Sequence, residues 1–413
     1  MRPILLVAFH FPPLTGSSGI QRTLRFAQYL PEFGWKPTVL SIAPHAYEAW
    51  DEKTLDQVPP GCEVIRARGY EAARELSIAG RYPGFLAIPD RWANWAWLNA
   101  GLGARVCRER GIEAIWSTYP IASAHQLGAA IARRTGLPWI ADFRDPMAQP
   151  GYPADPRRWR AYRRIEETAA REAARMVFVT PSALQSYREL FRDTPAERFE
   201  LLANGYDESV FASAGTPTPE TRAGRPLVLL HSGIVYPSER DPTALMDALA
   251  SLKSAGRIRE GQFVIRFRAP VHADLITGLA AERGVVGFVE IAPSVPYKAA
   301  IAEMTSVDAL LVMQGQNCNA QIPAKLYEYL RAGRPMLGLA DPEGDTGRTM
   351  LDVGVPHVAT LEDTAAIERT LPSFVEALAR DAVPTVPRSR IERYSRRALT
   401  GALAGLLERV VGA

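Results

Sequence analysis

The sequence has few of the features that mark secreted or membrane-spanning chains. Its three cysteines, Cys62, Cys107 and Cys318, match neither a disulfide framework nor a zinc site. No apolar run approaches the ~20 residues that cross a bilayer. The apolar start, MRPILLVAFHFPP, has no cleavage site and meets two prolines, so we expect a buried strand there rather than a signal peptide. We therefore expect a cytoplasmic protein.

An excess of charge of one sign is also lacking. The chain has 48 Lys and Arg against 45 Asp and Glu, a net charge of +3, so nothing in its charge points to a nucleic-acid partner. Hydrophobic residues make up 47% and charged residues 23%, an ordinary globular composition. A length of 413 residues exceeds the roughly 100–200 of one domain, so two domains are expected.

Strand-like and helix-like segments alternate along the first half. Apolar runs that fit buried strands occur at Pro3–Phe9, Lys36–Ile42, Ala114–Ser117, Trp139–Ala141, Met176–Val179 and Phe199–Leu202. Helical spacing separates most of them, for example at Gly19–Phe33, Ala122–Arg134 and Trp159–Ala174. Such alternation predicts a parallel, doubly wound α/β sheet.

A second α/β series follows a segment at 213–226 that is rich in Pro, Gly, Thr and Ala, which we interpret as a linker. Its strands are expected at Leu227–His231, Phe263–Phe267, Val286–Val289, Ala309–Met313 and Met336–Leu339. Its helices are expected at Pro242–Ser254 and Pro323–Ala332, with a last helix near Arg388–Val411. We therefore predict domains at 1–212 and 227–385, followed by a C-terminal helix within 386–413.

The loop after the first strand, HFPPLTGSSGIQR at 10–22, carries two glycines before a helix. Gly16 and Gly19 would let the backbone approach a ligand, and a helix N-terminus offers free N–H groups to an anion. Arg22, in the first helical turn, is placed to reach that ligand. A plain strand-to-helix turn explains the same glycines equally well, so both interpretations stay open.

Three charged residues, Asp142, Arg144 and Asp145, follow directly on a predicted strand in ADFRDP. Charges at such a position are costly unless they are paired or used. An Asp–Arg pair that only fixes the loop is one interpretation. We favour a mixed role, in which one carboxylate orients the arginine and the other charges face a ligand.

Two motifs of the second half carry groups suited to a nucleotide diphosphate. In PAKLYEYLRAGRP, Lys325 and Glu328 share one face at the start of a helix, where a cation adds to the attraction for anions and a carboxylate can accept hydrogen bonds from a ribose diol. In HSGIVYPSERDP, Gly233 ends the first strand of this half and Arg240 lies near a helix start, where a guanidinium can pair with phosphate. A surface salt bridge is the competing interpretation of the first motif.

The ordered set of motifs resembles the glycosyltransferase family 4 group. FPPLTGSSGIQR, WSTYP, ADFRDP, FVTPS, ANGYDESVF, HSGIVYPSERDP and PAKLYEYLRAGRP follow in family order over nearly the whole chain. The resemblance implies the GT-B fold, with two Rossmann-like domains facing a central cleft and the C-terminal helix packing back on the first domain. It also implies transfer of a sugar from a nucleotide-sugar donor, with a UDP-sugar expected, by a retaining reaction that uses no metal and no separate cofactor.

The resemblance also implies roles for individual residues. Glu328 would hold the donor ribose, whereas Arg240 and Lys325 would neutralise the diphosphate and act in catalysis together with Asp142. The remaining donor-side residues would be Gly16, Gly19, Gly233 and Asn319. The acceptor-side residues would be Arg22, Arg144 and Asp145.

Two positions depart from the family pattern. The first glutamate of the family's E-x7-E motif would fall at Ala320, which has no carboxylate. Sugar recognition would then use Asn317, Asn319 or Gln321. The family's arginine after the glycine of the second domain is Ile234 here, so Arg240 would act alone or with Arg268.

A basic stripe with aromatic residues suits an anionic membrane surface. Its residues are Arg157, Arg158, Trp159, Arg160, Arg163 and Arg164. Trp92, Trp95 and Trp97 add aromatic side chains. A solvated helix face with its tryptophan packed inward is the alternative. A membrane surface would bring the enzyme to a lipid-linked or glycan acceptor in surface polysaccharide assembly, at the inner face of the plasma membrane.

Two other functions stay open at this stage. One is a nucleotide-sugar epimerase, which shares the two-domain fold. The other is a non-catalytic scaffold that binds sugar nucleotides, which the missing carboxylate at Ala320 keeps in view.

Overall fold

The computed structural model describes residues 1–17, 19–214 and 224–412. Its contacts divide the chain into two compact units, of which unit 1 comprises Met1–Asn204 with Arg396–Ala413 and unit 2 comprises Gly205–Ser395. No helix among the described residues is both long and apolar enough to span a bilayer.

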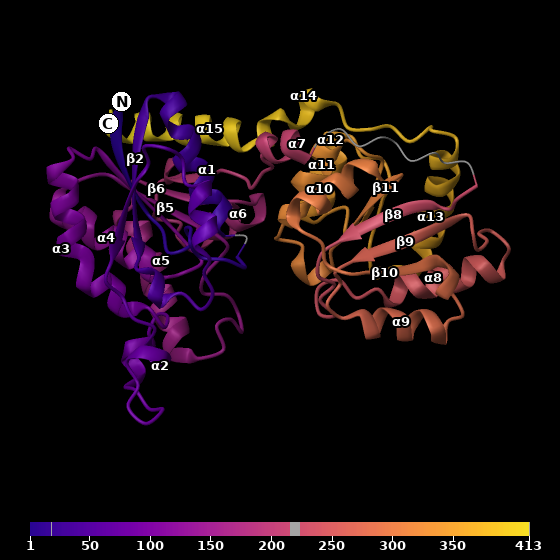
Figure 1. Ribbon diagram of the computed structural model, residues 1–413, viewed down its shortest axis with the longest axis horizontal. Helices are drawn as coiled ribbons and strands as arrows, with labels where there is room; N and C mark the ends of the chain where they lie inside the picture. Colours follow the sequence, from indigo (N-terminus) through magenta and orange to yellow (C-terminus); the bar gives the residue numbers. More distant parts are fainter. Residues whose placement is uncertain (18, 215–223, 413) are drawn as a thin grey trace. The chain divides into compact units, whose positions relative to one another are not determined.

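Unit 1 is built on a parallel sheet of seven strands, in the order β3-β2-β1-β4-β5-β6-β7 (Figure 1). The strands are β1 (Arg2–Val7), β2 (Trp35–Ile42), β3 (Glu63–Ala67), β4 (Ala114–Thr118), β5 (Trp139–Arg144), β6 (Arg175–Phe178) and β7 (Phe199–Leu201). The central strands β4 and β5 are buried along almost their whole length because helices cover both faces of the sheet. The sequence prediction missed β3, whose EVIRA alternates charged and apolar residues at the edge.

The helices of unit 1 form two packed groups. They are α1 (Ile20–Tyr29), α2 (Ala72–Glu75), α3 (Ala93–Glu109), α4 (Ser123–Thr135), α5 (Pro156–Glu172), α6 (Pro181–Leu190) and α15 (Arg396–Val411). α1 packs on α15, whereas α4 packs on both α3 and α5. Small residues bring α3 and α4 close together, since a Cβ at Gly103 would lie 2.2 Å from Ile131 Cδ1.

Unit 2 repeats the arrangement with six parallel strands, in the order β10-β9-β8-β11-β12-β13. They are β8 (Leu227–Ser232), β9 (Phe263–Arg268), β10 (Val289–Ala292), β11 (Ala309–Met313), β12 (Met336–Leu339) and β13 (Val358–Ala359). The helices are α7 (Glu208–Ala214), α8 (Thr243–Ser254), α9 (Ala273–Glu282), α10 (Tyr297–Ser306), α11 (Ala324–Ala332), α12 (Asp345–Val353), α13 (Thr364–Ala379) and α14 (Arg388–Ile391). Two doubly wound parallel α/β units are thus confirmed.

The borders of the units differ from the predicted domain limits. α7 belongs to unit 2 because Glu208 accepts hydrogen bonds from Arg331 and Arg388, and Arg331 stacks on Phe211. The predicted last helix is broken into α14, a 3-10 turn and α15, and the break at Ser395 coincides with the border between the units. Most of the predicted linker at 213–226 lies outside the described residues.

One strand was placed too early by the sequence. Val286–Phe288 forms a 3-10 turn, and β10 begins only at Val289. Val285 and Phe288 are buried in the core, so their apolar character reflects packing of the turn rather than a strand.

Candidate functional site

The site of unit 2 begins with a buried histidine at the end of β8. The Nδ1 atom of His231 lies 3.1 Å from the carbonyl oxygen of Leu311, so this nitrogen carries the proton and donates. Its Nε2 is therefore an acceptor, and Lys325 Nζ lies 3.2 Å away. Burial, followed by the charge of Lys325, holds the pKa of His231 well below its ordinary value, so the ring is neutral.

Lys325 lies in the first turn of α11, at the helix end that attracts anions. Burial, followed by the positive charge of Arg240, lowers its pKa to about 7, and Glu328 opposes this shift in part. An anion bound beside the amine would raise the pKa again, because it favours the charged form. Lys325 is thus a cation whose charge depends on the occupancy of the site.

Gly233 makes room for this lysine. Its φ is +109°, which L side chains rarely adopt, and a Cβ built there would lie 3.1 Å from Lys325 Nζ. Its N–H donates to the carbonyl oxygen of Arg268 at 2.8 Å, which fixes the turn after β8. A side chain at this position would displace the amine from the site.

Arg240 supplies a second cation, and only 8% of its surface is exposed. It donates to Gln314 Oε1 at 3.2 Å and to Glu239 Oε2 at 3.1 Å, and it stacks on Tyr236. Its Nε is buried and has no hydrogen-bond partner within the described residues. An anionic ligand oxygen would satisfy this donor.

Glu328 lies one turn after Lys325 on α11 and is half-buried. Tyr297, the first residue of α10, donates its hydroxyl to Glu328 Oε1 at 2.5 Å. The tyrosine thereby orients the carboxylate that the resemblance assigns to the ribose. Sequence reasoning assigned no role to Tyr297 or to His231, because only the folded unit brings these residues to the start of α11.

The segment around Ala320 is held by its own side chains. Asn319 Nδ2 donates to Asp341 Oδ2 at 2.6 Å, and Asn317 Nδ2 donates to the carbonyl oxygen of Ser238 at 2.6 Å. Arg268 is paired with Glu303 at 2.7 Å. The structure thus gives Asn319, Asn317 and Arg268 structural partners, and their role toward a donor stays a prediction.

The site of unit 1 joins three loops at the ends of β1, β4 and β5. Arg144 Nη1 lies 3.5 Å from the carbonyl oxygens of Gly19 and Tyr119, and its Nε is buried without a partner within the described residues. A Cβ at Gly19 would lie 2.3 Å from His10 Nδ1, so glycine is required there. Burial, followed by the charge of Arg144, lowers the pKa of His10 to about 4.

Arg22 and Asp142 form a buried ion pair in unit 1. Arg22 Nε donates to Asp142 Oδ2 at 2.5 Å, and the two side chains are 1% and 0% exposed. Arg22 also donates to the carbonyl oxygens of Leu202 and Ala203, after β7. Both residues therefore tie the start of α1 to the ends of β5 and β7. The partner of Asp142 is thus Arg22 rather than Arg144, the arginine of its own loop.

The other predicted residues of unit 1 stay near this pair. Asp145 is exposed beside Arg144, and Gly16 has a φ of +74° in the same loop as Gly19. Ser18, between the two glycines, lies outside the described residues. The structure therefore brings Gly19, Arg144, Arg22 and Asp142 together, while their catalytic or acceptor-side roles stay predictions.

A comparison with protein families finds a match, which covers most of the first unit. Residues 18–205 match the model of the glycosyl transferase 4-like domain. No curated protein sequence matches the chain.

The whole chain shares its fold with solved glycosyltransferase structures. It is similar to sucrose-phosphate synthase from Thermosynechococcus elongatus (13% identity, 100% of both chains, TM-score 0.64). It is also similar to HepE from Anabaena, solved in complex with UDP-glucose (13% identity, 99% of this chain and 100% of that chain, TM-score 0.65). WaaG, a glycosyltransferase involved in lipopolysaccharide biosynthesis, shares 16% identity over 98% and 99% of the two chains, with a TM-score of 0.58. The chain thus has the GT-B fold.

The basic stripe of unit 1 lies on α5 and is only partly free. Trp159 is half-buried, and its Nε1–H donates to the carbonyl oxygen of Gln149. Arg158 donates to the carbonyl oxygen of Pro89, and Arg163 pairs with the buried Glu166. The exposed arginines of the stripe are Arg157, Arg160 and Arg164. Half of the stripe therefore serves the packing of the domain.

Proposed function

We propose that the chain transfers a sugar from a nucleotide-sugar donor, a UDP-sugar, to a glycan or lipid-linked acceptor in surface polysaccharide assembly. The observation that carries the donor half is the unpartnered, buried Nε of Arg240 in the neighbourhood of Lys325. Two cations whose charges are incompletely compensated suit a diphosphate. The complexes named for HepE and the role named for WaaG support the choice of donor and pathway.

The donor would occupy the start of α11. Its diphosphate would accept hydrogen bonds from Arg240 and Lys325 and from the N–H groups of the first helical turn. Its ribose would donate to Glu328, whose carboxylate Tyr297 holds at 2.5 Å. We infer that Gly233 leaves the space that the phosphates need beside Lys325.

Departure of the nucleotide diphosphate is the difficult step. The bond from the anomeric carbon to the phosphate oxygen breaks, the sugar gains oxocarbenium character, and negative charge collects on the leaving oxygens. Arg240 and Lys325 would stabilise that charge directly and without a metal. The acceptor oxygen then bonds to the anomeric carbon, with retention of configuration.

The proton of the acceptor hydroxyl needs a base. Asp142 is fully buried against Arg22, so we propose that the departing diphosphate takes the proton. Arg144 and Asp145 would contact the acceptor, since the unpartnered Nε of Arg144 can donate to an acceptor oxygen. The exposed arginines of α5 would bring the domain to an anionic inner membrane surface, where a lipid-linked acceptor resides.

A two-step experiment tests this proposal. The chain is first screened by thermal shift against UDP-, GDP-, dTDP- and CMP-sugars, because a ligand at 100 times its Kd stabilises the folded state by about 2.7 kcal/mol. The stabilising donor, labelled in its sugar, is then incubated with a lipid and glycan extract. We expect the wild-type protein to transfer label to the extract and Arg240→Gln to transfer none. The control variant Arg257→Gln, which removes an exposed charge of unit 2, should transfer label like the wild type.

The other outcomes name the alternatives. Label that remains in a nucleotide sugar of altered configuration would indicate an epimerase. Stabilisation by a donor without any turnover, with every acceptor fraction tried, would indicate a sugar-nucleotide-binding scaffold. Stabilisation by no donor would contradict the donor site itself.

A further inference from the structure

A pocket of about 340 Å³ opens among α3, α4 and α5 of unit 1, away from the β-strand ends described above. These helices lie on one side of the sheet (Figure 1). Ala96 and Ala100 of α3 and Ala129 and Ala130 of α4 line it, and their small side chains leave the space open. The donor and acceptor residues proposed above take no part in it.

The charged residues that line this pocket are all arginines: Arg133, Arg134 and Arg164. Arg133 is neutralised by Glu172, at 2.6 Å. Arg134 and Arg164 are exposed and make no hydrogen bond or ion pair with any residue that the structure describes. The pocket thus carries two uncompensated positive charges and no lining carboxylate, which suits a phosphate group.

The pocket also holds a buried histidine with an unused donor. Ser117 Oγ accepts the Nε1 proton of Trp139 at 2.8 Å, and its own proton can go to His125 Nδ1, also at 2.8 Å. The ring proton then sits on His125 Nε2, which is buried and has no partner within the described residues. Buried donors are rarely left unpaired, so a ligand acceptor in the pocket fits this atom.

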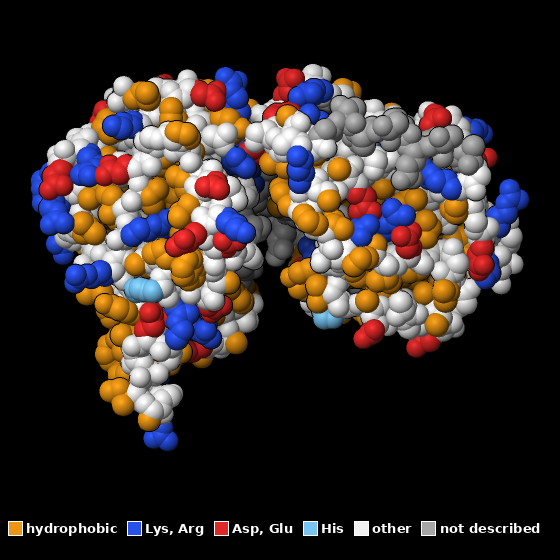
Figure 2. Space-filling model, in the orientation of Figure 1, with side chains coloured by type: hydrophobic (Ala, Val, Ile, Leu, Met, Phe, Trp, Pro, Cys, Tyr) orange, Lys and Arg blue, Asp and Glu red, His pale blue; other side chains and the backbone are white. Residues whose placement is uncertain are grey.

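An exposed aromatic surface borders the pocket. Trp97, which lines it, is 53% exposed and stacks on Phe85, which is 63% exposed, at 6.5 Å between ring centroids. Phe85 lies in the 3-10 turn Gly84–Ala87, which follows α2 in the sequence. Figure 1 shows that the chain near α2 protrudes from unit 1, and Figure 2 shows hydrophobic side chains along this protrusion with a basic group at its end. Aromatic rings of this kind favour the interface between water and lipid.

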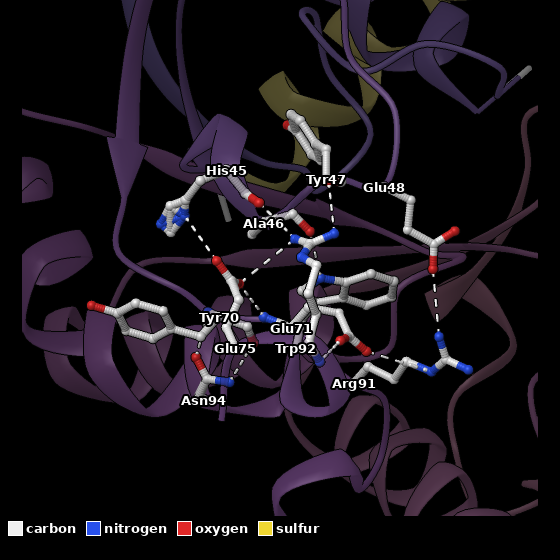
Figure 3. Close-up of polar contacts among 11 residues, drawn as sticks. His45, Ala46, Tyr47, Glu48, Tyr70, Glu71, Glu75, Arg91, Trp92 and Asn94 are labelled. Carbon is white, nitrogen blue, oxygen red and sulfur yellow. Dashed lines mark hydrogen bonds and ion pairs between the residues drawn. The ribbon is translucent and has the colours of Figure 1, made fainter. Parts of the chain in front are cut away.

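The base of the protrusion is fixed rather than loose. Asn94 Nδ2 donates to the carbonyl oxygen of Tyr70, and Asn94 Oδ1 accepts the N–H of the same residue, at 2.7 and 2.8 Å. Arg74 donates to the carbonyl oxygens of His45 and Tyr47. Figure 3 labels both of these residues together with Asn94 and Tyr70. The exposed aromatic residues are therefore held in place next to the pocket.

We propose that the pocket binds the phosphate of an anionic phospholipid. Arg134 and Arg164 hold the phosphate, His125 Nε2 donates to a headgroup oxygen inside, and the acyl chains leave along Trp97 and Phe85. A soluble phosphate would need the arginines alone, whereas the apolar lining and the exposed rings fit a tailed ligand. The inference goes beyond the proposed function, because it assigns one lipid phosphate to a defined pocket and requires no sugar transfer. It rests on that function only in Arg164, which is also one of the exposed arginines of α5.

The test uses full-length protein and three probes in calorimetry. They are dihexanoyl phosphatidylglycerol, dihexanoyl phosphatidylcholine and inorganic phosphate, with both lipids below their micellar concentrations. We expect saturable binding of the phosphatidylglycerol only. It should weaken at least tenfold in Arg134→Ala/Arg164→Ala and in Ala130→Phe, which fills the pocket and keeps the arginines. Arg105→Ala/Arg108→Ala, an equal loss of charge on α3, should bind like the wild type.

Three results would overturn the proposal. Equal weakening in the Arg105/Arg108 control would mean that general surface charge binds the lipid. Phosphate alone binding as tightly as the phosphatidylglycerol would remove the lipid from the site. Greater weakening in Arg157→Ala/Arg160→Ala than in the pocket variants would assign the lipid to the exposed stripe of α5. Because the readout is lipid binding, each result is independent of whether the chain transfers sugar.

Discussion

Donor binding should draw a proton from solution at alkaline pH, because Lys325 is poised near neutrality. Burial and Arg240 lower its pKa to about 7 in the free protein. A diphosphate beside the amine favours the charged form and raises that pKa. At pH 8 the free amine is about 90% deprotonated, so binding takes up about 0.9 proton.

The sign and size of the pH dependence follow from this shift. Affinity is greatest about one pH unit or more below 7, where the lysine is already charged, and it falls as the pH rises through 7. If the bound-state pKa exceeds 9, affinity drops about fiftyfold between pH 7 and pH 9, which is about 2.3 kcal/mol. His231 cannot supply the proton, since its Nε2 is the acceptor for Lys325.

Calorimetry with the donor identified in the thermal-shift screen measures the effect. Repeating the titration at pH 8 in two buffers of different ionisation enthalpy counts the protons taken up, and a nucleotide-sugar diphosphate does not itself titrate near neutrality. Lys325→Met should bind more weakly at pH 7 and without proton uptake. Affinity that is flat from pH 7 to 9, or uptake that persists in Lys325→Met, would refute the reasoning.

Three further predictions concern single contacts. Arg22→Met or Asp142→Asn should destabilise the protein by about 3–5 kcal/mol in urea unfolding, because each leaves a buried polar or charged partner without its ion pair. The double variant Arg22→Met/Asp142→Leu should recover most of that loss. Unchanged stability in the single variants would contradict the structural role of the pair. Tyr297→Phe should raise the donor KM about fivefold with little change in kcat, because one hydrogen bond that orients Glu328 is lost; a fall in kcat alone would argue against it. Burial lowers the pKa of His125 to about 3 in the folded protein. Between pH 3 and 6.5 the histidine is therefore protonated only in the unfolded state, so the free energy of unfolding falls as the pH falls. His125→Leu should reduce that slope by about 1.4 kcal/mol per pH unit in denaturation series between pH 4 and 6.5, and an unaltered slope would mean that other groups set it.

Much of the fold could be predicted from the sequence, because buried parallel strands are continuous apolar runs. β11 and β12 were predicted with the limits that the structure shows. β3 and β13 were missed because edge strands are short or carry charges on their open side. β10 was misplaced because the turn before it is also buried.

The candidate site was predicted in part, where its residues stand in recognisable loops. Arg240, Lys325 and Glu328 were found from helix starts and spacing, but their partners were not. His231 contacts Lys325 and Tyr297 contacts Glu328 from segments far away in the sequence, and no local pattern marks such contacts. The burial of Asp142 against Arg22 is likewise a product of packing, since 120 residues separate the pair along the chain.

The most direct test of the donor site is the affinity of the nucleotide sugar for matched variants of unit 2. Arg240→Ala and Glu328→Ala should each weaken binding at least tenfold, since each removes a charged contact to the donor worth about 1.5–3 kcal/mol. Arg257→Ala, which removes an exposed charge from the same unit, should leave it unchanged. Wild-type affinity in both Arg240→Ala and Glu328→Ala would contradict the donor site proposed at the start of α11.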